Sequence, residues 1–194
     1  VVNIIEDVTE EKDAERRQRF LAEAGELLAS TLDYERTLQH VAGLAVPTLA
    51  DWCAVDLIDD TGGLSRVALA HVDPAKRELG ERLQRDYPPD LSEDAGIGGV
   101  LRHGRSQLWA DITDAMLVEG AVDEEQLRVL REVGMRSAMI VPLRGRDRTI
   151  GAITFVSAES RRAFDAADLE FCEQLARRAG IAIENARLYT ARGT

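Results

Sequence analysis

Two neighbouring segments, residues 137–143 and 150–156, constrain the fold of this chain more than any other feature. Both are short and rich in branched apolar residues, and the turn-forming stretch Arg144-Gly145-Arg146-Asp147 separates them, so they predict a β-hairpin. Neither segment alternates apolar with polar residues, as a strand with one face in water does. The hairpin therefore predicts a sheet that other parts of the chain cover on both faces.

Three further segments have the pattern of strands. Residues 51–58 and 64–72 flank the turn 59–63 and predict a second antiparallel hairpin, and residues 106–110 predict a short strand. The segments between the hairpins carry helical patterns. The chain is therefore predicted to be an α+β domain with a central antiparallel sheet of five to six strands.

The N-terminal segment changes character within a few residues. Residues 1–5 are apolar and predict a strand, after which a charged helix begins with Asp7 or Thr9 as its N-cap. Residues 13–19 are almost wholly polar, as expected for a linker helix. From Phe20 onward, apolar residues at intervals of three and four predict a buried helix face that ends near Thr31.

The middle of the chain predicts four further helices. Asp33, Pro74 and Asp123 mark helix starts, and Gly134 marks a helix end. Residues 111–122 are predicted to form a loop. The four predicted helices span residues 34–49 (with Pro47 ending or kinking the helix), 74–87, a short stretch that follows the turn 96–99 and ends at His103, and 123–133.

A long helix is predicted over residues 165–189. Its apolar residues follow one another at intervals of three and four, as in a coiled-coil seam. The small side chains in this seam permit a close approach to another helix. The seam residues are Leu169, Cys172, Ala176, Ala179, Ile183 and Ala186.

Over residues 19–189 the chain resembles a GAF domain. The resemblance rests on four stretches in the expected order: 136–143 (RSAMIVPL), 150–155 (IGAITF), 164–169 (FDAADL) and 181–189 (IAIENARLY). Residues 1–12 resemble the end of a PAS domain, where a last strand runs into a D-[IV]-T-E-x-K helix start. The predicted organisation is a PAS end with linker helix (1–18), a GAF domain with flanking helices (19–189), and the start of a linker to an output domain (190–194).

This resemblance implies a non-catalytic sensory or regulatory module of a cytoplasmic bacterial signalling protein. The pattern is most similar to actinobacterial proteins in which a PAS and a GAF domain precede a sensor histidine kinase or a PP2C-type phosphatase. The resemblance places the N- and C-terminal helices on one face of the sheet and pocket-forming helices and loops on the other. The terminal helices are expected to form a bundle with those of a second chain, which makes the module a homodimer.

Charge and composition exclude several classes of protein. The net charge of −11 and the pI of about 4.8 argue against binding to nucleic acid or to anionic membranes. The longest uncharged stretch, residues 37–50, is too short to span a bilayer. An acidic domain also disfavours highly anionic ligands, unless the arginines, which make up 22 of the 24 basic residues, cluster locally.

Motifs for catalysis and for cofactor binding are missing from the sequence, so we predict no catalytic residue, no metal and no cofactor. Some GAF domains bind haem through a histidine, but His40, His71 and His103 are scattered. Cys53 and Cys172 are predicted to be buried hydrophobic residues rather than redox cysteines or sites for covalent attachment of a bilin chromophore, as in phytochrome-type GAF domains. Phe164 and Asp168 match only part of the cyclic-nucleotide motif of GAF domains, because no Asn-Lys precedes them.

A ligand pocket, if the domain has one, is expected between the sheet and residues 90–135. Trp109 and Met139 are the candidate walls, and Asp111 and Ser137 are the candidate polar contacts. The alternative interpretations are a core position for Trp109 and a loop or capping role for Asp111. The alternative function is accordingly a small-molecule receptor that binds a metabolite, a cyclic nucleotide or haem.

Overall fold

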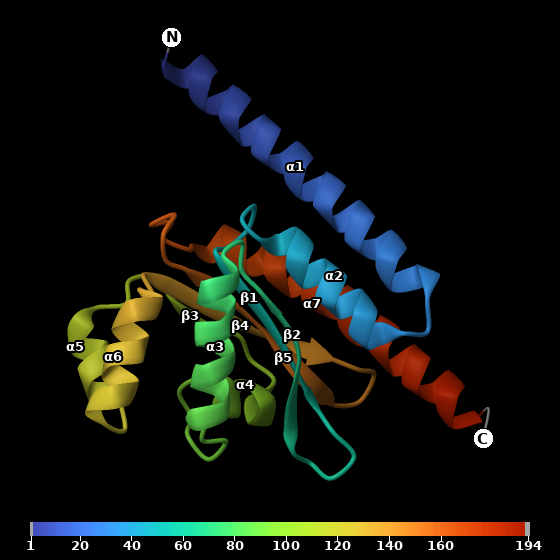
Figure 1. Ribbon diagram of the computed structural model, residues 1–194. Helices are drawn as coiled ribbons and strands as arrows, with labels where there is room; N and C mark the ends of the chain where they lie inside the picture. The colour runs from blue at the N-terminus through green and yellow to red at the C-terminus, as the bar shows by residue number, and fades with distance from the viewer. Residues whose placement is uncertain (1, 193–194) are drawn as a thin grey trace.

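A five-stranded antiparallel sheet forms the centre of the computed structural model, which describes residues 2–192 (Figure 1). Two hairpins are joined edge to edge through β1 and β5, which gives the order β2-β1-β5-β4-β3. The predicted α+β class and antiparallel sheet are therefore confirmed. The strands are β1 (Trp52–Ile58), β2 (Leu64–Ala70), β3 (Gln107–Trp109), β4 (Ser137–Arg144) and β5 (Thr149–Ser157).

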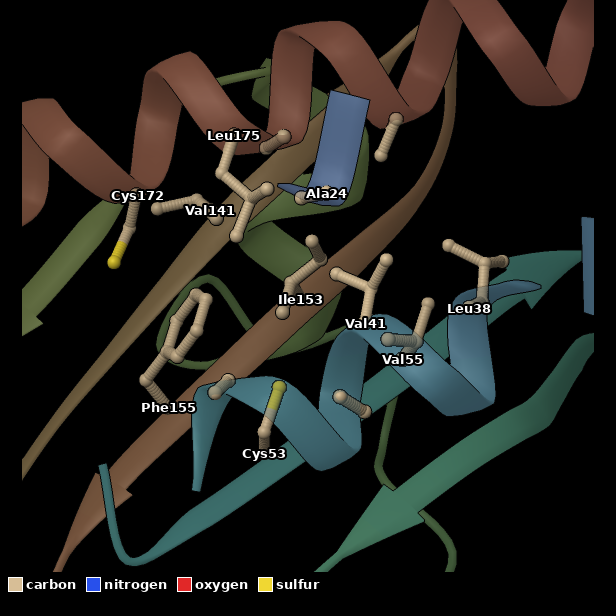
Figure 2. Close-up of a cluster of buried hydrophobic side chains, with 14 of the residues drawn as sticks. Ala24, Leu38, Val41, Cys53, Val55, Val141, Ile153, Phe155, Cys172 and Leu175 are labelled. Carbon is tan, nitrogen blue, oxygen red and sulfur yellow. The ribbon is translucent and has the colours of Figure 1, made fainter. Parts of the chain in front are cut away.

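A layer of three helices lies on one face of the sheet, which we call the bundle face; two of them pack on the strands, and the N-terminal helix packs on those two. The three helices are α1 (Val2–Ser30), α2 (Tyr34–Ala45) and α7 (Ala166–Arg192). Alternate residues of the central strands point toward these helices and form one continuous apolar core with them. Figure 2 shows this core, in which Val55, Val141, Ile153 and Phe155 of the strands meet Val41 of α2 and Leu175 of α7.

Four helices of 7 to 13 residues lie on the other side, which we call the short-helix face (Figure 1). They are α3 (Pro74–Asp86), α4 (Ile97–His103), α5 (Asp114–Gly120) and α6 (Glu124–Val133). The prediction of a loop over residues 111–122 is wrong, because α5 lies within it. This helix buries none of its residues, so no apolar period marks it in the sequence. Thr113 caps its start, and an ion pair from Arg131 to Asp114 (2.8 Å) holds it on α6.

The predicted starts of α2, α3 and α6 are confirmed, but the predicted N-cap at Asp7 or Thr9 is wrong, because both residues lie inside α1. The carboxylates of Asp33, Asp73 and Asp123 accept hydrogen bonds from backbone N–H groups in the first turns of α2, α3 and α6. Gly134 adopts the left-handed conformation that ends α6. Helix α2 ends at Ala45, earlier than predicted, and is followed by the cis peptide bond Val46–Pro47.

The N-terminal segment differs from its prediction. The expected strand over residues 1–5 is wrong: residues 2–5 are helical, and Val1 lies outside the described residues. The residues that follow are strong helix formers, and extending an existing helix adds one hydrogen bond for each residue fixed. A side-chain hydrogen bond from Thr9 to the carbonyl of Ile5 (2.9 Å) joins the two parts. This continuation of the helix overrides the strand preference of the branched residues.

The predicted seam of α7 lies within the domain itself. All of its residues except the half-buried Leu169 are buried, and the helix packs on β4 and α1 of the same chain. A Cβ atom at Gly180 would lie 2.3 Å from the carbonyl oxygen of Arg144, so the small residue is required at this contact. Within residues 2–192, no helix has the length and apolar character needed to cross a membrane.

Candidate functional site

The structure does not bring the four predicted pocket residues together. Met139 points into the core of the bundle face, whereas Trp109 packs with Ile140 on the short-helix face. The register explains this separation: Trp109 pairs with Ala138, and neighbouring residues of a strand point to opposite faces. Asp111 is exposed in the loop after β3. A ligand contact at Trp109 or Asp111 stays a prediction.

Ser137 has a structural role at the start of β4. Its hydroxyl donates a hydrogen bond to the carbonyl oxygen of Trp109 (2.9 Å) and accepts one from the backbone N–H of Phe164 (3.0 Å). The side chain is fully buried. It therefore ties the edge strand β3 to the segment that leads into α7, and its hydrogen bonds are used within the fold.

An ion pair that sequence reasoning missed lies on the short-helix face. Asp56 in β1 has a fully buried carboxylate, and Arg66 in β2 binds both of its oxygens, with N–O distances of 3.0 and 3.1 Å. A β-bulge makes the pairing: Val55 is opposite Ala68, but Asp56 is opposite Arg66, so Val67 is the extra residue. Without the bulge, Asp56 would face Val67 instead of a cation.

Burial and the cation act on Asp56 in opposite directions. Burial raises the pKa of the Asp56 carboxyl, and the adjacent guanidinium of Arg66 offsets part of that rise. The sequence carried a signal for this site, namely a lone aspartate inside the apolar strand WCAVDLI. Such a residue needs a buried partner, because an unpaired charge in an apolar interior is costly.

The rest of the short-helix face is filled by two small apolar clusters. One contains Trp52, Leu69 and Val133, and the other contains Val100, Ile140 and Ala152. The loop before α4 lies directly on that helix: a Cβ at Gly99 would lie 1.9 Å from the carbonyl oxygen of Asp94. Helix α4 and its preceding loop are therefore closely packed on each other, and α4 itself packs on β4 and β5.

The bundle face connects the two long helices by direct contacts. Arg17 of α1 forms an ion pair with Asp168 of α7 (2.5 Å), and its guanidinium lies over the ring of Phe171, 5.4 Å from the centroid. Phe20 packs on Phe171 with the ring centroids 6.0 Å apart. Two turns further along α7, Arg178 donates to the backbone carbonyl of Leu21 (3.3 Å). We call these contacts the α1–α7 clasp.

The cysteines and histidines do not gather into a reactive site. Burial raises the pKa of the Cys53 thiol to about 12, and it also raises the pKa of Cys172. His71 lies beside Glu159 (3.4 Å) and His103 beside Asp94 (3.2 Å), while His40 is exposed. In the part of the chain that the structure describes, no three His, Cys, Asp or Glu residues are placed to hold a metal ion.

The sequence profile of the GAF domain family matches residues 31–184, which is most of the chain. The chain therefore belongs to the GAF domain family. No curated protein is a significant match to it.

Solved GAF domains share the fold at low sequence identity. The GAF domain of a phosphoenolpyruvate-protein phosphotransferase from Coxiella burnetii has a TM-score of 0.66 and 21% identity, with 92% of this chain and 98% of that chain covered. A GAF domain from a protein described as a sensor histidine kinase of Pseudomonas syringae pv. tomato has a TM-score of 0.62 and 18% identity, covering 95% and 98%. Free methionine-R-sulfoxide reductase from Neisseria meningitidis has a TM-score of 0.61 and 19% identity, covering 89% and 91%.

Proposed function

We propose that this chain is a non-catalytic sensory module of a cytoplasmic signal-transduction protein, and that it relays a signal along α1 and α7 within a homodimer. The main observation in support of this proposal is the α1–α7 clasp. Residues 17, 20 and 21 of α1 contact residues 168, 171 and 178 of α7 in the same order, so the two helices run parallel. In Figure 1 the start of α1 and the end of α7 accordingly project at opposite ends of the domain. A displacement of one helix would shift the other through the clasp.

The proposed context is a sensor histidine kinase or a PP2C-type phosphatase. The fold shared with a GAF domain from a protein described as a sensor histidine kinase supports the kinase. An upstream PAS domain would connect through α1. The stretch Asp7-Val8-Thr9-Glu10-Glu11-Lys12 lies inside that helix, so the connection would be a continuous helix rather than a strand followed by a helix.

The state of the two thiols supports a non-catalytic role. A cysteine attacks or binds a metal as its thiolate, and a raised pKa keeps the thiol protonated at neutral pH. Cys53 and Cys172 are both buried in the core of the bundle face, which also denies substrates access to them. The chain shares its fold with a methionine-R-sulfoxide reductase, but these cysteines lack the environment of reactive ones.

Exposed apolar residues on the two helices support the dimer. Ile4 and Ile5 in α1 are 69% and 63% exposed, and Ile181 and Leu188 in α7 are 52% and 43% exposed. Ile181 and Leu188 are seven residues apart, which places them on one stripe of the helix. The buried seam of α7 serves the domain's own core, so a second chain would pack on this other stripe.

Light scattering on the 194-residue chain tests the dimer. We expect a mass of two chains at micromolar concentration, and a mass of one chain for Leu188→Glu, which places a charge in the proposed contact. Val122→Glu is the matched control, because Val122 is 81% exposed and lies on the short-helix side. A monomeric wild-type chain contradicts the dimer, and so does a Leu188→Glu chain with the mass of the wild type.

A further inference from the structure

An arginine-lined cavity lies at the edge of the sheet, outside the predicted pocket. Pairing between β3 and β4 extends only as far as Gln107 and Ile140, so the last four residues of β4 pass beside the α4–β3 turn. Helix α7 forms the third side. The cavity has a volume of about 450 Å³ and is lined by Gly104, Arg105, Ser106, Pro142, Arg144, Leu169, Glu173 and Arg177.

Two of its three arginines have free guanidinium groups. Arg105 and Arg177 are exposed, and neither side chain has an ion-pair or hydrogen-bond partner among residues 2–192. Half of the arginines form ion pairs with carboxylates within residues 2–192, for example Arg77 with Glu81, Arg128 with Glu125 and Arg131 with Asp114. Arg105 and Arg177 are thus two free guanidiniums that line the same cavity, in a chain with a net charge of −11.

The third arginine is held in place by the turn. Gly104 ends α4 in the left-handed conformation, and its carbonyl oxygen accepts a hydrogen bond from Arg144. This contact fixes the direction of the Arg144 side chain and satisfies one of the free carbonyls at the end of α4. The remaining N–H groups of Arg144 are available to a ligand.

The charges around the cavity are predominantly positive. Glu173 is the one carboxylate in its lining, and it accepts a hydrogen bond from the Ser106 hydroxyl (2.7 Å). A second hollow of about 530 Å³ shares Gly104 and Arg144 and adds Arg146 and Arg148. Asp147 is the carboxylate in the lining of this hollow, and arginines outnumber it there as well. Three arginines against one carboxylate in the first cavity give an excess of two positive charges.

We propose that this cavity binds a small phosphate-bearing molecule. A guanidinium group binds phosphate and carboxylate through paired hydrogen bonds. Three guanidiniums from three separate elements suit a tetrahedral phosphoryl group, which offers three oxygens, better than a planar carboxylate, which offers two. Pro142 and Leu169 supply an apolar wall for the organic part, and the volume is within the range of about 300–1,000 Å³ for ligand sites. This binding site goes beyond the proposed relay and does not depend on it.

Isothermal titration calorimetry with inorganic pyrophosphate, at constant ionic strength, tests the site. We expect the wild-type chain to bind pyrophosphate, and Arg105→Gln and Arg177→Gln each to weaken binding about tenfold or more, because each removes charge-assisted hydrogen bonds. Arg36→Gln is the matched control: Arg36 is exposed on α2, its side chain has no ion-pair or hydrogen-bond partner among residues 2–192, and it does not line the cavity. Its affinity should equal that of the wild type.

The outcomes separate a built site from general charge attraction. Loss of affinity in both cavity variants and not in Arg36→Gln supports the proposal. An equal loss in all three variants, or no binding by the wild-type chain, overturns it. Sodium sulfate in place of pyrophosphate should bind more weakly, since sulfate carries fewer negative charges, and equal affinity for both anions would also contradict a phosphate site. Because the dimer is measured by mass, a negative result here leaves the proposed relay standing or falling on its own test.

Discussion

The bundle face and the short-helix face of the sheet are built on opposite principles. On the bundle face, one continuous apolar core joins the strands to α1, α2 and α7. On the short-helix face, two small apolar clusters accompany the ion pair between the buried Asp56 and Arg66. Apolar packing is not directional, whereas an ion pair holds a single geometry. The comparison indicates that the bundle face supplies most of the free energy of folding. On the short-helix face, the structure depends more on a few particular residues.

The largest expected effect is a core truncation on the bundle face. Phe155→Ala removes a fully buried ring from the centre of β5 and should lower the free energy of unfolding by about 3–5 kcal/mol. Trp109→Ala, on the short-helix face, removes a half-buried ring and should cost about half as much. Urea denaturation of both variants measures the difference. If the two costs are equal, the faces contribute equally and the comparison fails.

The buried ion pair gives the next largest effect. Arg66→Met leaves the carboxylate of Asp56 without its partner, and breaking a buried pair costs about 3 kcal/mol. The loss should shrink as the pH falls, because without Arg66 burial alone raises the pKa of Asp56, and protonation then removes the buried charge. Urea denaturation at several pH values measures it.

The double variant Asp56→Leu with Arg66→Met is the control for that experiment. It removes both charges, so it should recover much of the stability lost in Arg66→Met alone. A double variant as unstable as the single one would show that the pair acts through packing rather than through charge.

The comparison of faces also explains what the sequence predicted well and what it predicted poorly. The doubly apolar hairpin and the capping residues Asp33, Asp73 and Asp123 act through near neighbours in the chain, so their structures followed from local patterns. The bundle face obeys helical periodicity along α7 for the same reason.

The features that sequence reasoning missed depend on register or on distant residues. The bulge at Val67 is what places Arg66 opposite Asp56, and no local pattern marks it. The predicted pocket contains both Met139 and Trp109, but these side chains point to opposite faces of the sheet. The face on which each side chain lies depends on how β3 aligns with β4, which the sequence does not show. Arg105 and Arg177 are distant in the sequence, and they line one cavity only because the α4–β3 turn and α7 both lie beside β4.

A smaller loss of stability is expected from a substitution at Asp51, the residue directly before β1. Although burial opposes its ionisation, hydrogen bonds from the backbone N–H groups of Ala158 and Ser160 and from the Ser160 hydroxyl hold the pKa of Asp51 below its usual value. Asp51→Asn should therefore cost about 1–2 kcal/mol at neutral pH. Because the folded pKa is lowered, this stability is present above the unfolded pKa of about 3.9 and is lost as the pH falls through the folded value. The urea midpoints of variant and wild type should converge only in acid, and convergence near neutral pH would contradict the assignment.

The smallest expected effect tests whether α1 can shift relative to the sheet. Arg17→Gln removes the ion pair with Asp168 and the contact over Phe171, at a cost of about 0.5–1 kcal/mol because Arg17 is partly exposed. The loss should be local: hydrogen exchange should quicken in the N-terminal half of α1, which has few other contacts, and stay unchanged in β4 and β5. Arg19→Gln, whose pair with Glu15 is exposed and lies within α1, is the control and should change neither region. A uniform increase in exchange across the sheet would contradict a local loss, and would mean that the clasp cannot shift independently of the sheet.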